Sequence, residues 1–188
     1  VMRALEVAGS ILGKDVLVTG GSGGVGQLAI QLAVMSGARV TAVSSSADRR
    51  VALRALGAHA AVADVGEADG PFAFVLESVG GSSLASAIEK IAPGGVVVTI
   101  GNSSEEETVF NPRTLYAKGA ATIYGLIVFE ELDSRRIGAH DLRRLLDFVA
   151  AGRLQPKIER RRDWTDLPSL LAELENRSFS GKAVLTIE

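Results

Sequence analysis

Short apolar runs alternate along the chain with longer segments whose apolar positions recur every three to four residues. The short runs are rich in β-branched residues and predict strands. These strands are expected at residues 15–19, 39–43, 60–63, 72–76, 96–100 and 121–128. The longer segments predict helices at about residues 24–36, 47–56, 82–91, 112–118 and 142–151. Such alternation predicts an α/β fold with an open, doubly wound, mostly parallel sheet and helices on both faces.

The pattern changes at Gln155-Pro156, where a charged stretch begins. Residues 1–156 carry the alternating pattern and are expected to form one domain. Residues 157–188 predict a strand, a helix and a strand, which either complete the same sheet or belong to a neighbouring domain. The length of 188 residues suits one domain, or one domain with a small appendage.

Composition and charge exclude several classes of function. The 20 basic and 22 acidic residues give a net charge of −2, so nucleic acid and anionic membrane surfaces are not expected partners. The chain has no cysteine, which excludes disulfides and thiolate zinc sites within it. Two isolated histidines, His59 and His140, do not form a metal-ligand pattern, so no metal is expected. The first residues resemble neither a signal peptide nor a membrane span, which favours a cytoplasmic location.

A glycine-rich turn follows the first predicted strand. Gly21, Gly23 and Gly26 satisfy G-x-G-x-x-G between a β-branched strand and an amphipathic helix, as in the Rossmann fold. The first glycine allows a tight turn, the second lets backbone approach a diphosphate, and the third allows close helix packing. The expected diphosphate-binding residues are Gly21, Ser22, Gly23, Gly24, Val25 and Gly26. A glycine-rich turn without a ligand is the alternative, and the absence of a following Gly-Lys-Ser/Thr excludes a P-loop.

The end of the second predicted strand indicates which cofactor binds. A carboxylate there would bind the ribose 2′-hydroxyl of NAD, but the chain continues with Ser44, Ser45 and Ser46. Arg49 follows in the next helix. Hydroxyl donors and a guanidinium group suit a 2′-phosphate, so NADP(H) is favoured over NAD(H). The alternative is a polar helix cap with solvated arginines.

Together these segments resemble the medium-chain dehydrogenase/reductase superfamily, and most closely its zinc-independent quinone oxidoreductase and enoyl reductase branch. The resemblance extends through Leu-Glu-Ser-Val-Gly-Gly at 76–81, Pro-Gly-Gly at 93–95 and Gly-Lys-Ala-Val-Leu at 181–185. It implies an oxidoreductase that uses NADPH to deliver hydride to a quinone or an activated C=C bond of a small molecule. It also implies an N-terminal catalytic domain that precedes the cofactor domain and is absent from this chain, and to which residues 157–188 would return.

The resemblance also assigns roles to individual residues. It places Gly23, Gly24 and Val25 on the diphosphate, and Ser45, Ser46 and Arg49 on the 2′-phosphate. The remaining implied contacts are Ser78 and Val79 at the adenosine or ribose, and Gly101, Asn102, Leu126, Ile127 and Val128 at the nicotinamide ribose. One departure is Asp64, which stands where many relatives carry a tyrosine, and whose charge opposes a 2′-phosphate.

Three further expectations are open. A homodimer through the apolar edge strand 121–128 is one reading of that segment, and a strand covered by the helix at 142–149 is the other. Glu77 either touches a ribose or accepts hydrogen bonds from nearby backbone N–H groups. No catalytic acid is visible, so a non-catalytic dinucleotide-binding or redox-sensing module is the second functional hypothesis.

A short-chain dehydrogenase is a weaker alternative. Thr19, Gly20, Gly24 and Gly26 also fit T-G-x-x-x-G-x-G. That class needs a Tyr-x-x-x-Lys pair, in which the lysine lowers the pKa of the tyrosine. Tyr116 and Tyr124 are followed four residues later by Ala120 and Val128, so neither fits.

Overall fold

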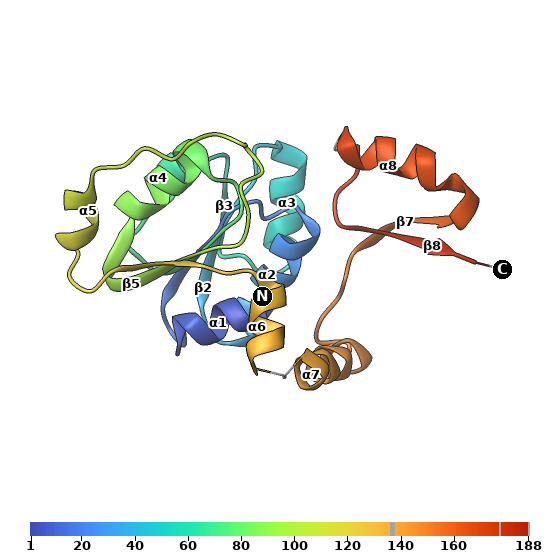
Figure 1. Ribbon diagram of the computed structural model, residues 1–188, viewed down its shortest axis with the longest axis horizontal. Helices are drawn as coiled ribbons and strands as arrows, with labels where there is room; N and C mark the ends of the chain where they lie inside the picture. The colour runs from blue at the N-terminus through green and yellow to red at the C-terminus, as the bar shows by residue number, and fades with distance from the viewer. Residues whose placement is uncertain (136–137, 177, 188) are drawn as a thin grey trace.

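The computed structural model describes residues 1–135, 138–176 and 178–187. Its centre is a six-stranded, wholly parallel sheet with the order β3-β2-β1-β4-β5-β6 (Figure 1). The strands are β1 (Asp15–Val18), β2 (Arg39–Val43), β3 (Ala60–Val62), β4 (Phe72–Glu77), β5 (Ile91–Thr99) and β6 (Thr122–Gly125). The strand order reverses between β1 and β4. The expected doubly wound Rossmann architecture is therefore confirmed.

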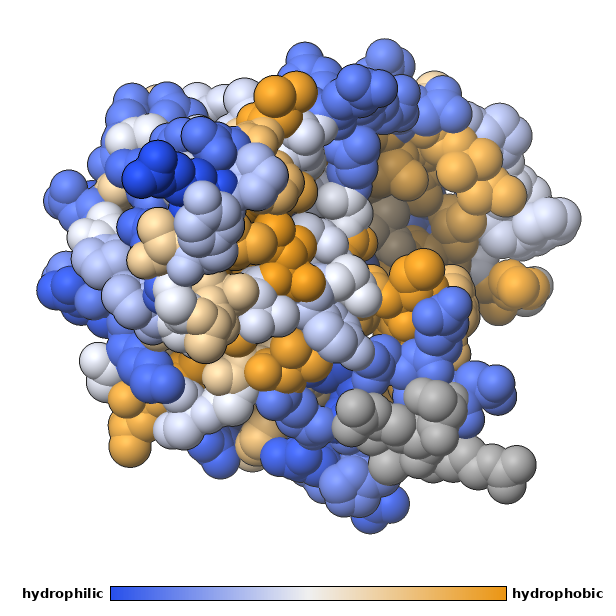
Figure 2. Space-filling model, turned by 60° about the vertical axis from the view of Figure 1, so that its left-hand side comes forward, coloured by the Kyte–Doolittle hydropathy of each residue, from blue (hydrophilic) through white to orange (hydrophobic). Residues whose placement is uncertain are grey.

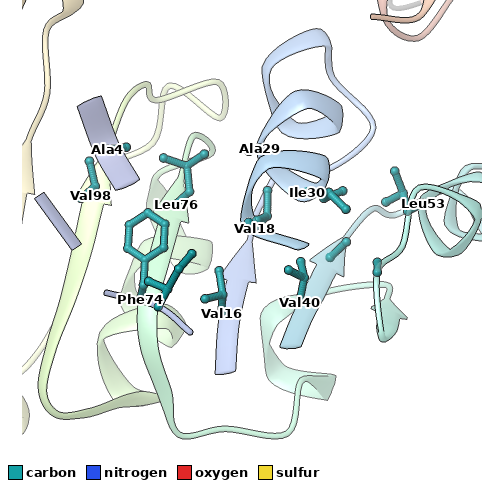
Figure 3. Packing of buried hydrophobic residues seen from close by; sticks show 14 residues of the cluster. Ala4, Val16, Val18, Ala29, Ile30, Val40, Leu53, Phe74, Leu76 and Val98 are labelled. Atoms are coloured by element: carbon teal, nitrogen blue, oxygen red, sulfur yellow. The ribbon is translucent and has the colours of Figure 1, made fainter. Parts of the chain in front are cut away.

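Helices cover both faces of this sheet. Those packed on it are α1 (Met2–Ala8), α2 (Gly24–Met35) and α3 (Ala47–Ala55) on one face and α4 (Gly81–Glu89) on the other. The chain also forms α5 (Pro112–Tyr116), α6 (Val128–Arg135) and α7 (Gly138–Ala150), with a 3₁₀ turn η1 at Val65–Glu67. Alternate strand residues enter two separate cores. Val16 and Val18 pack with α1, α2 and α3 on one face (Figure 3), whereas Leu17 packs with α4 on the other. This burial on both faces explains why the strands are nearly continuous apolar runs.

Residues after Pro156 form a unit of their own, here called the tail. It consists of β7 (Ile158–Asp163), the 3₁₀ turn η2 (Trp164–Asp166), α8 (Leu167–Glu175) and β8 (Lys182–Thr186). β7 and β8 pair in parallel as a separate two-stranded sheet, set apart from the main sheet in Figure 1. Of the two placements open from the sequence, the tail therefore does not complete the main sheet.

Two hydrogen bonds join Gln155, just before the tail begins, to α2 of the main unit. The Gln31 side chain of α2 bonds both backbone groups of Gln155, with Nε2 donating to the carbonyl at 3.1 Å and Oε1 accepting from the N–H at 2.8 Å. Trp164 and Leu174 of the tail stay more than half exposed. Figure 2 shows hydrophobic surface on the walls of a hollow at the right of the molecule.

Three boundaries differ from the sequence predictions. The strand expected at 121–128 is only Thr122–Gly125, and Val128 instead begins α6, which was not predicted. Glu130 and Glu131 in the first turn favour a helix there, because acidic side chains complement its dipole. Pro93-Gly94-Gly95 lies between the helix predicted at 82–91 and the strand predicted at 96–100, but in the structure it is part of β5, which begins at Ile91. There the register with β4 shifts, and the Gly94 N–H donates to the Gly119 carbonyl at 2.8 Å.

Within the described ranges, no helix is long and apolar enough to cross a membrane. The cytoplasmic location stays a prediction.

Candidate functional site

A cleft of about 830 Å³ opens at the carboxyl ends of the central strands, where the strand order reverses. Open α/β sheets bind their ligands at this position. Eleven of the seventeen residues predicted from the sequence line the cleft. They are Ser22, Gly23, Gly24, Val25, Gly26, Ser44, Ser45, Arg49, Ser78, Val79 and Gly101.

The glycine turn connects β1 to α2, as the G-x-G-x-x-G spacing predicts. The Gly21 N–H donates to the Val43 carbonyl at 2.9 Å, and a Cβ on Gly21 would lie 3.0 Å from Leu53 Cδ1. Gly21 therefore faces β2 and α3, not the cleft. A Cβ on Gly26 would lie 2.7 Å from Gly21 Cα, so only glycine lets α2 approach the turn this closely. The last glycine has the packing role expected of it.

The start of α2 presents backbone donors to the cleft. Gly23 is the N-cap residue, and Gly24, Val25 and Gly26 form the first helical turn. The N–H groups of a first turn have no partner within their own helix, and the helix dipole adds partial positive charge. The Gln27 side chain braces the turn by donating to the Ser22 carbonyl at 2.8 Å. This arrangement is suited to holding a diphosphate.

Lys182 is a candidate residue that the sequence reasoning missed. A Cβ on Gly24 would lie 2.9 Å from Lys182 Cε, so the lysine chain lies directly over the first turn of α2. Among the described residues Lys182 has no ion-pair partner. The sequence placed Lys182 in a C-terminal strand, but no pattern along the chain indicates that this strand begins beside the glycine turn.

The serine segment lies next to the glycine turn. Ser44 is buried, and its hydroxyl donates to Ser22 Oγ at 3.3 Å. Ser46 does not line the cleft. Its hydroxyl caps α3 by accepting a hydrogen bond from the Arg49 N–H at 3.4 Å, so the capping alternative is correct for this residue. Asp64 lines the same cleft and accepts a hydrogen bond from the Gly66 N–H at 2.6 Å.

Glu77 is wholly buried at the end of β4 and is absent from the cleft wall. Its carboxylate accepts hydrogen bonds from the N–H groups of Val79 at 3.1 Å and Gly80 at 3.0 Å. It also accepts from the hydroxyls of Thr19 at 3.1 Å and Ser83 at 3.0 Å. Of the two roles open from the sequence, the bonds to backbone N–H groups are confirmed. Glu77 ties the end of β1 to the turn that carries Ser78 and Val79.

The residues predicted to contact the nicotinamide ribose are not all on the cleft wall, and their contact with a cofactor stays a prediction. Asn102, Leu126, Ile127 and Val128 do not line the cleft. Asn102 instead packs against Gly80 and donates from Nδ2 to the Glu106 carbonyl at 3.4 Å. β6 ends at Gly125, but the Leu126 N–H still donates to the Thr99 carbonyl at 2.9 Å, and Leu126 packs against the core cluster that includes Ala4 of α1. Ile100 and Ser103 line this end of the cleft beside Gly101.

Two further walls were not expected from the sequence. Ser82, Ser83 and Ser86 of α4 face the cleft opposite the segment 63–66 that follows β3. The tail contributes the second wall, through Leu174, Phe179, Ser180 and Gly181. These residues lie far apart in the sequence, and only the fold brings them together.

The tail wall is fixed by charged side chains. The Arg160 guanidinium group lies 5.4 Å from the centre of the Phe179 ring, and its Nε donates to Glu173 at 2.8 Å. Glu159 accepts hydrogen bonds from Ser180, and a hydrogen bond from Lys157 lowers the pKa of the Glu159 carboxyl. These contacts keep Phe179 and Ser180 at the edge of the cleft.

No group of three or more histidine, aspartate or glutamate side chains in the described part of the chain is arranged to hold a metal ion. His140 lies 3.5 Å from the carboxylate of Asp141, on the surface.

The fold and the cleft define a Rossmann-type domain whose switch point presents a glycine turn and, beside it, a serine- and arginine-lined segment. Comparison with known proteins agrees with this class. The sequence model of the family described as zinc-binding dehydrogenase matches residues 24–151. The chain belongs to this family, and through it to the medium-chain dehydrogenase/reductase superfamily.

Several individual proteins are similar to the chain. A spectinabilin polyketide synthase system protein of Streptomyces orinoci is 31% identical over 97% of this chain and 9% of that protein. A 2-methylene-furan-3-one reductase of Solanum lycopersicum is 42% identical over 52% of this chain and 26% of that protein. The solved quinone oxidoreductase of Coxiella burnetii superposes with a TM-score of 0.80 at 26% identity, covering 100% of this chain and 57% of that one. The chain therefore spans only part of each protein that it matches. Membership of this superfamily implies a nicotinamide dinucleotide as the cofactor.

Proposed function

We propose that the chain is the NADP(H)-binding unit of an oxidoreductase that transfers hydride from NADPH to a quinone or an α,β-unsaturated carbonyl compound. The observation that carries the choice of NADP(H) is the serine segment, with Ser44, Ser45 and Arg49 on the cleft wall and no carboxylate at the end of β2. The similarity to the tomato 2-methylene-furan-3-one reductase and to the Coxiella quinone oxidoreductase supports a small-molecule substrate of this class.

Different residues of the cleft would hold the diphosphate and the 2′-phosphate of the cofactor. The amides at the start of α2 and the ammonium group of Lys182 would hold the diphosphate, which both nicotinamide cofactors carry. Ser45 and Arg49 would hold the 2′-phosphate, which only NADP(H) carries. When bound, the nicotinamide ring supplies the hydride, and the protein orients that ring and limits access of water.

The side chains on the cleft wall also bear on the second hypothesis, a non-catalytic dinucleotide-binding module. The described lining of the cleft includes no histidine, tyrosine or cysteine that could donate a proton to a substrate, and the neighbouring Lys182 is assigned to the diphosphate. We therefore propose that the proton donor and most of the substrate site lie outside this chain, and that no metal takes part. A non-catalytic dinucleotide-binding module remains the second candidate, and oxidation of NADPH by this chain with a quinone or an enone would exclude it.

Titration of NADPH and NADH against the wild type, Arg49→Ala and Lys182→Ala tests the assignment. Arg49→Ala is expected to weaken NADPH binding about tenfold or more and to leave NADH binding nearly unchanged, because a charge-assisted hydrogen bond contributes about 1.5–3 kcal/mol. Lys182→Ala is expected to weaken both cofactors by the same factor, because the diphosphate is common to them. Isothermal calorimetry measures all six affinities.

Two outcomes contradict the proposal at different points. Unchanged NADPH affinity in Arg49→Ala would refute the 2′-phosphate assignment but leave the diphosphate site intact. A wild-type chain that binds neither nucleotide would refute the proposed function itself.

We also propose that the free edge of β6 pairs with a second copy of the chain. β6 is the last strand of the sheet, and Thr122 at its start is exposed. The helix at 142–149 does not bury its apolar stripe there, because Leu142 and Leu146 are more than half exposed. Light scattering is expected to give twice the monomer mass for the wild type and the monomer mass for Thr122→Lys, which places charge on the edge. A monomeric wild type would refute the pairing.

A further inference from the structure

Two consecutive arginines at the start of α3 make different contacts. Arg49 lines the cleft. Arg50 lies on the other side of the serine segment, and its Nη1 donates to the carbonyls of Ser44 at 2.9 Å and Ser45 at 3.0 Å. One guanidinium nitrogen carries two hydrogens, so it can serve both carbonyls at once. Arg50 therefore holds the backbone of the two serines that face the cleft.

This contact fixes the direction of two peptide planes. In a trans peptide the carbonyl and the following N–H point in opposite directions. Since the carbonyls of Ser44 and Ser45 both point at Arg50, the N–H groups of Ser45 and Ser46 both point away from it. Neither N–H donates to an acceptor among the described residues. Two adjacent backbone donors are thus aimed to one side of the segment, next to the N-terminus of α3.

We propose that Arg50 is a positioning residue that selects NADP(H) without touching it. It orients the Ser45 and Ser46 N–H groups so that they donate to the phosphomonoester on the adenosine ribose, and Arg49 supplies the direct charge contact. Ser46, whose hydroxyl caps α3, then contributes to the site through its backbone. This inference rests on the proposed NADP(H) site and adds to it the group that shapes the 2′-phosphate pocket.

The neighbouring contacts explain why an arginine is needed. Ser44 is fixed on its other side, since its N–H donates to the Val62 carbonyl at 3.0 Å and its hydroxyl bonds Ser22. Ser45 is exposed and has no comparable hydrogen bond among the described residues. Without Arg50, the Ser45–Ser46 peptide would lose the contact that sets its orientation. NADH carries a neutral 2′-hydroxyl in place of the phosphomonoester, so its affinity is expected to depend much less on that orientation.

The test compares Arg50→Met, Arg50→Lys and a control, Arg54→Met. Methionine keeps much of the side-chain length and removes the donors, whereas lysine restores one charged nitrogen. Arg54 lies on the same helix, and among the described residues its side chain makes only a long, exposed hydrogen bond to the His59 carbonyl at 3.4 Å. Dissociation constants of NADPH, NADH and 2′,5′-ADP are measured for each variant, together with the thermal midpoint and far-ultraviolet circular dichroism.

Arg50→Met is expected to raise the dissociation constants of NADPH and 2′,5′-ADP about tenfold and to change that of NADH less than about twofold. Arg50→Lys should recover part of the loss, and Arg54→Met should match the wild type. An equal loss for NADPH and NADH, or no loss for either, would overturn the inference. If the wild type binds neither NADPH nor NADH, the proposed function fails, and that result is separate from any effect of Arg50.

Discussion

Replacing Gly26 by alanine is expected to abolish measurable binding of both NADPH and NADH. The new methyl group would lie 2.7 Å from Gly21 Cα and closer still to the Gly20 carbonyl oxygen. These are backbone atoms, so α2 must move away from the turn. Overpacking of this kind costs about 1–3 kcal/mol of folding free energy. The first-turn amides move with the helix, and we expect dissociation constants to rise at least about 100-fold, equivalent to about 2.7 kcal/mol.

Gly125→Ala is the matched control. A Cβ there meets nothing closer than Thr99 Oγ1 at 3.9 Å, and the residue has no positive φ. Its free energy of unfolding should change by less than about 0.5 kcal/mol, as is usual away from packed sites, and its nucleotide affinities should stay at the wild-type values. Nucleotide affinity that survives Gly26→Ala would show that the diphosphate does not bind at this turn.

Glu77→Leu is expected to lower the free energy of unfolding by about 3–5 kcal/mol. Leucine has a similar volume but cannot accept the hydrogen bonds of the Val79 and Gly80 N–H groups or of the Thr19 and Ser83 hydroxyls. Each buried donor left without an acceptor costs about 1–3 kcal/mol. Urea denaturation should therefore show a lower midpoint with an unchanged slope.

Glu89→Leu controls for the chemical change itself. Glu89 is exposed at the end of α4, so the same substitution there should alter stability by less than about 0.5 kcal/mol. A Glu77→Leu protein as stable as the Glu89→Leu protein would mean that the buried hydrogen bonds contribute little net free energy.

The sequence predicted the fold well because local patterns determine it. The strands at 15–19 and 39–43 and the glycine turn between strand and helix depend on residues adjacent in the chain, and the structure has β1, β2 and the turn where expected. Pro93-Gly94-Gly95 shows the limit. Proline and glycines signal a break, but the pairing of β5 with β4 absorbs them as an irregularity in a continuing strand.

The site was predicted less completely because much of it is formed by distant segments. Gly21–Gly26 and Ser44–Ser45 follow their own strands, so their place at the sheet edge could be inferred. Lys182 lies over Gly24 only because the tail returns to α2, which no periodicity encodes. The contrast between Arg49 and Arg50 depends on side-chain direction, and the two residues are equivalent in the sequence. The end of β6 was predicted three residues too late, and the contact of Asn102 and residues 126–128 with a cofactor stays a prediction.

The hydrogen bonds between the glycine turn and the serine segment fix the distance between these two parts of the cleft wall. β1 and β2 are locked in register, with Val18 opposite Ala42, and the Gly21 N–H bonds the Val43 carbonyl just beyond that pair. The spacing between the backbones of these two segments, which we propose hold the phosphate groups of the cofactor, is thus set by sheet geometry. A dinucleotide whose phosphate groups were spaced differently could place only one of them against the backbone donors. The cleft would reject such a compound by length as well as by charge.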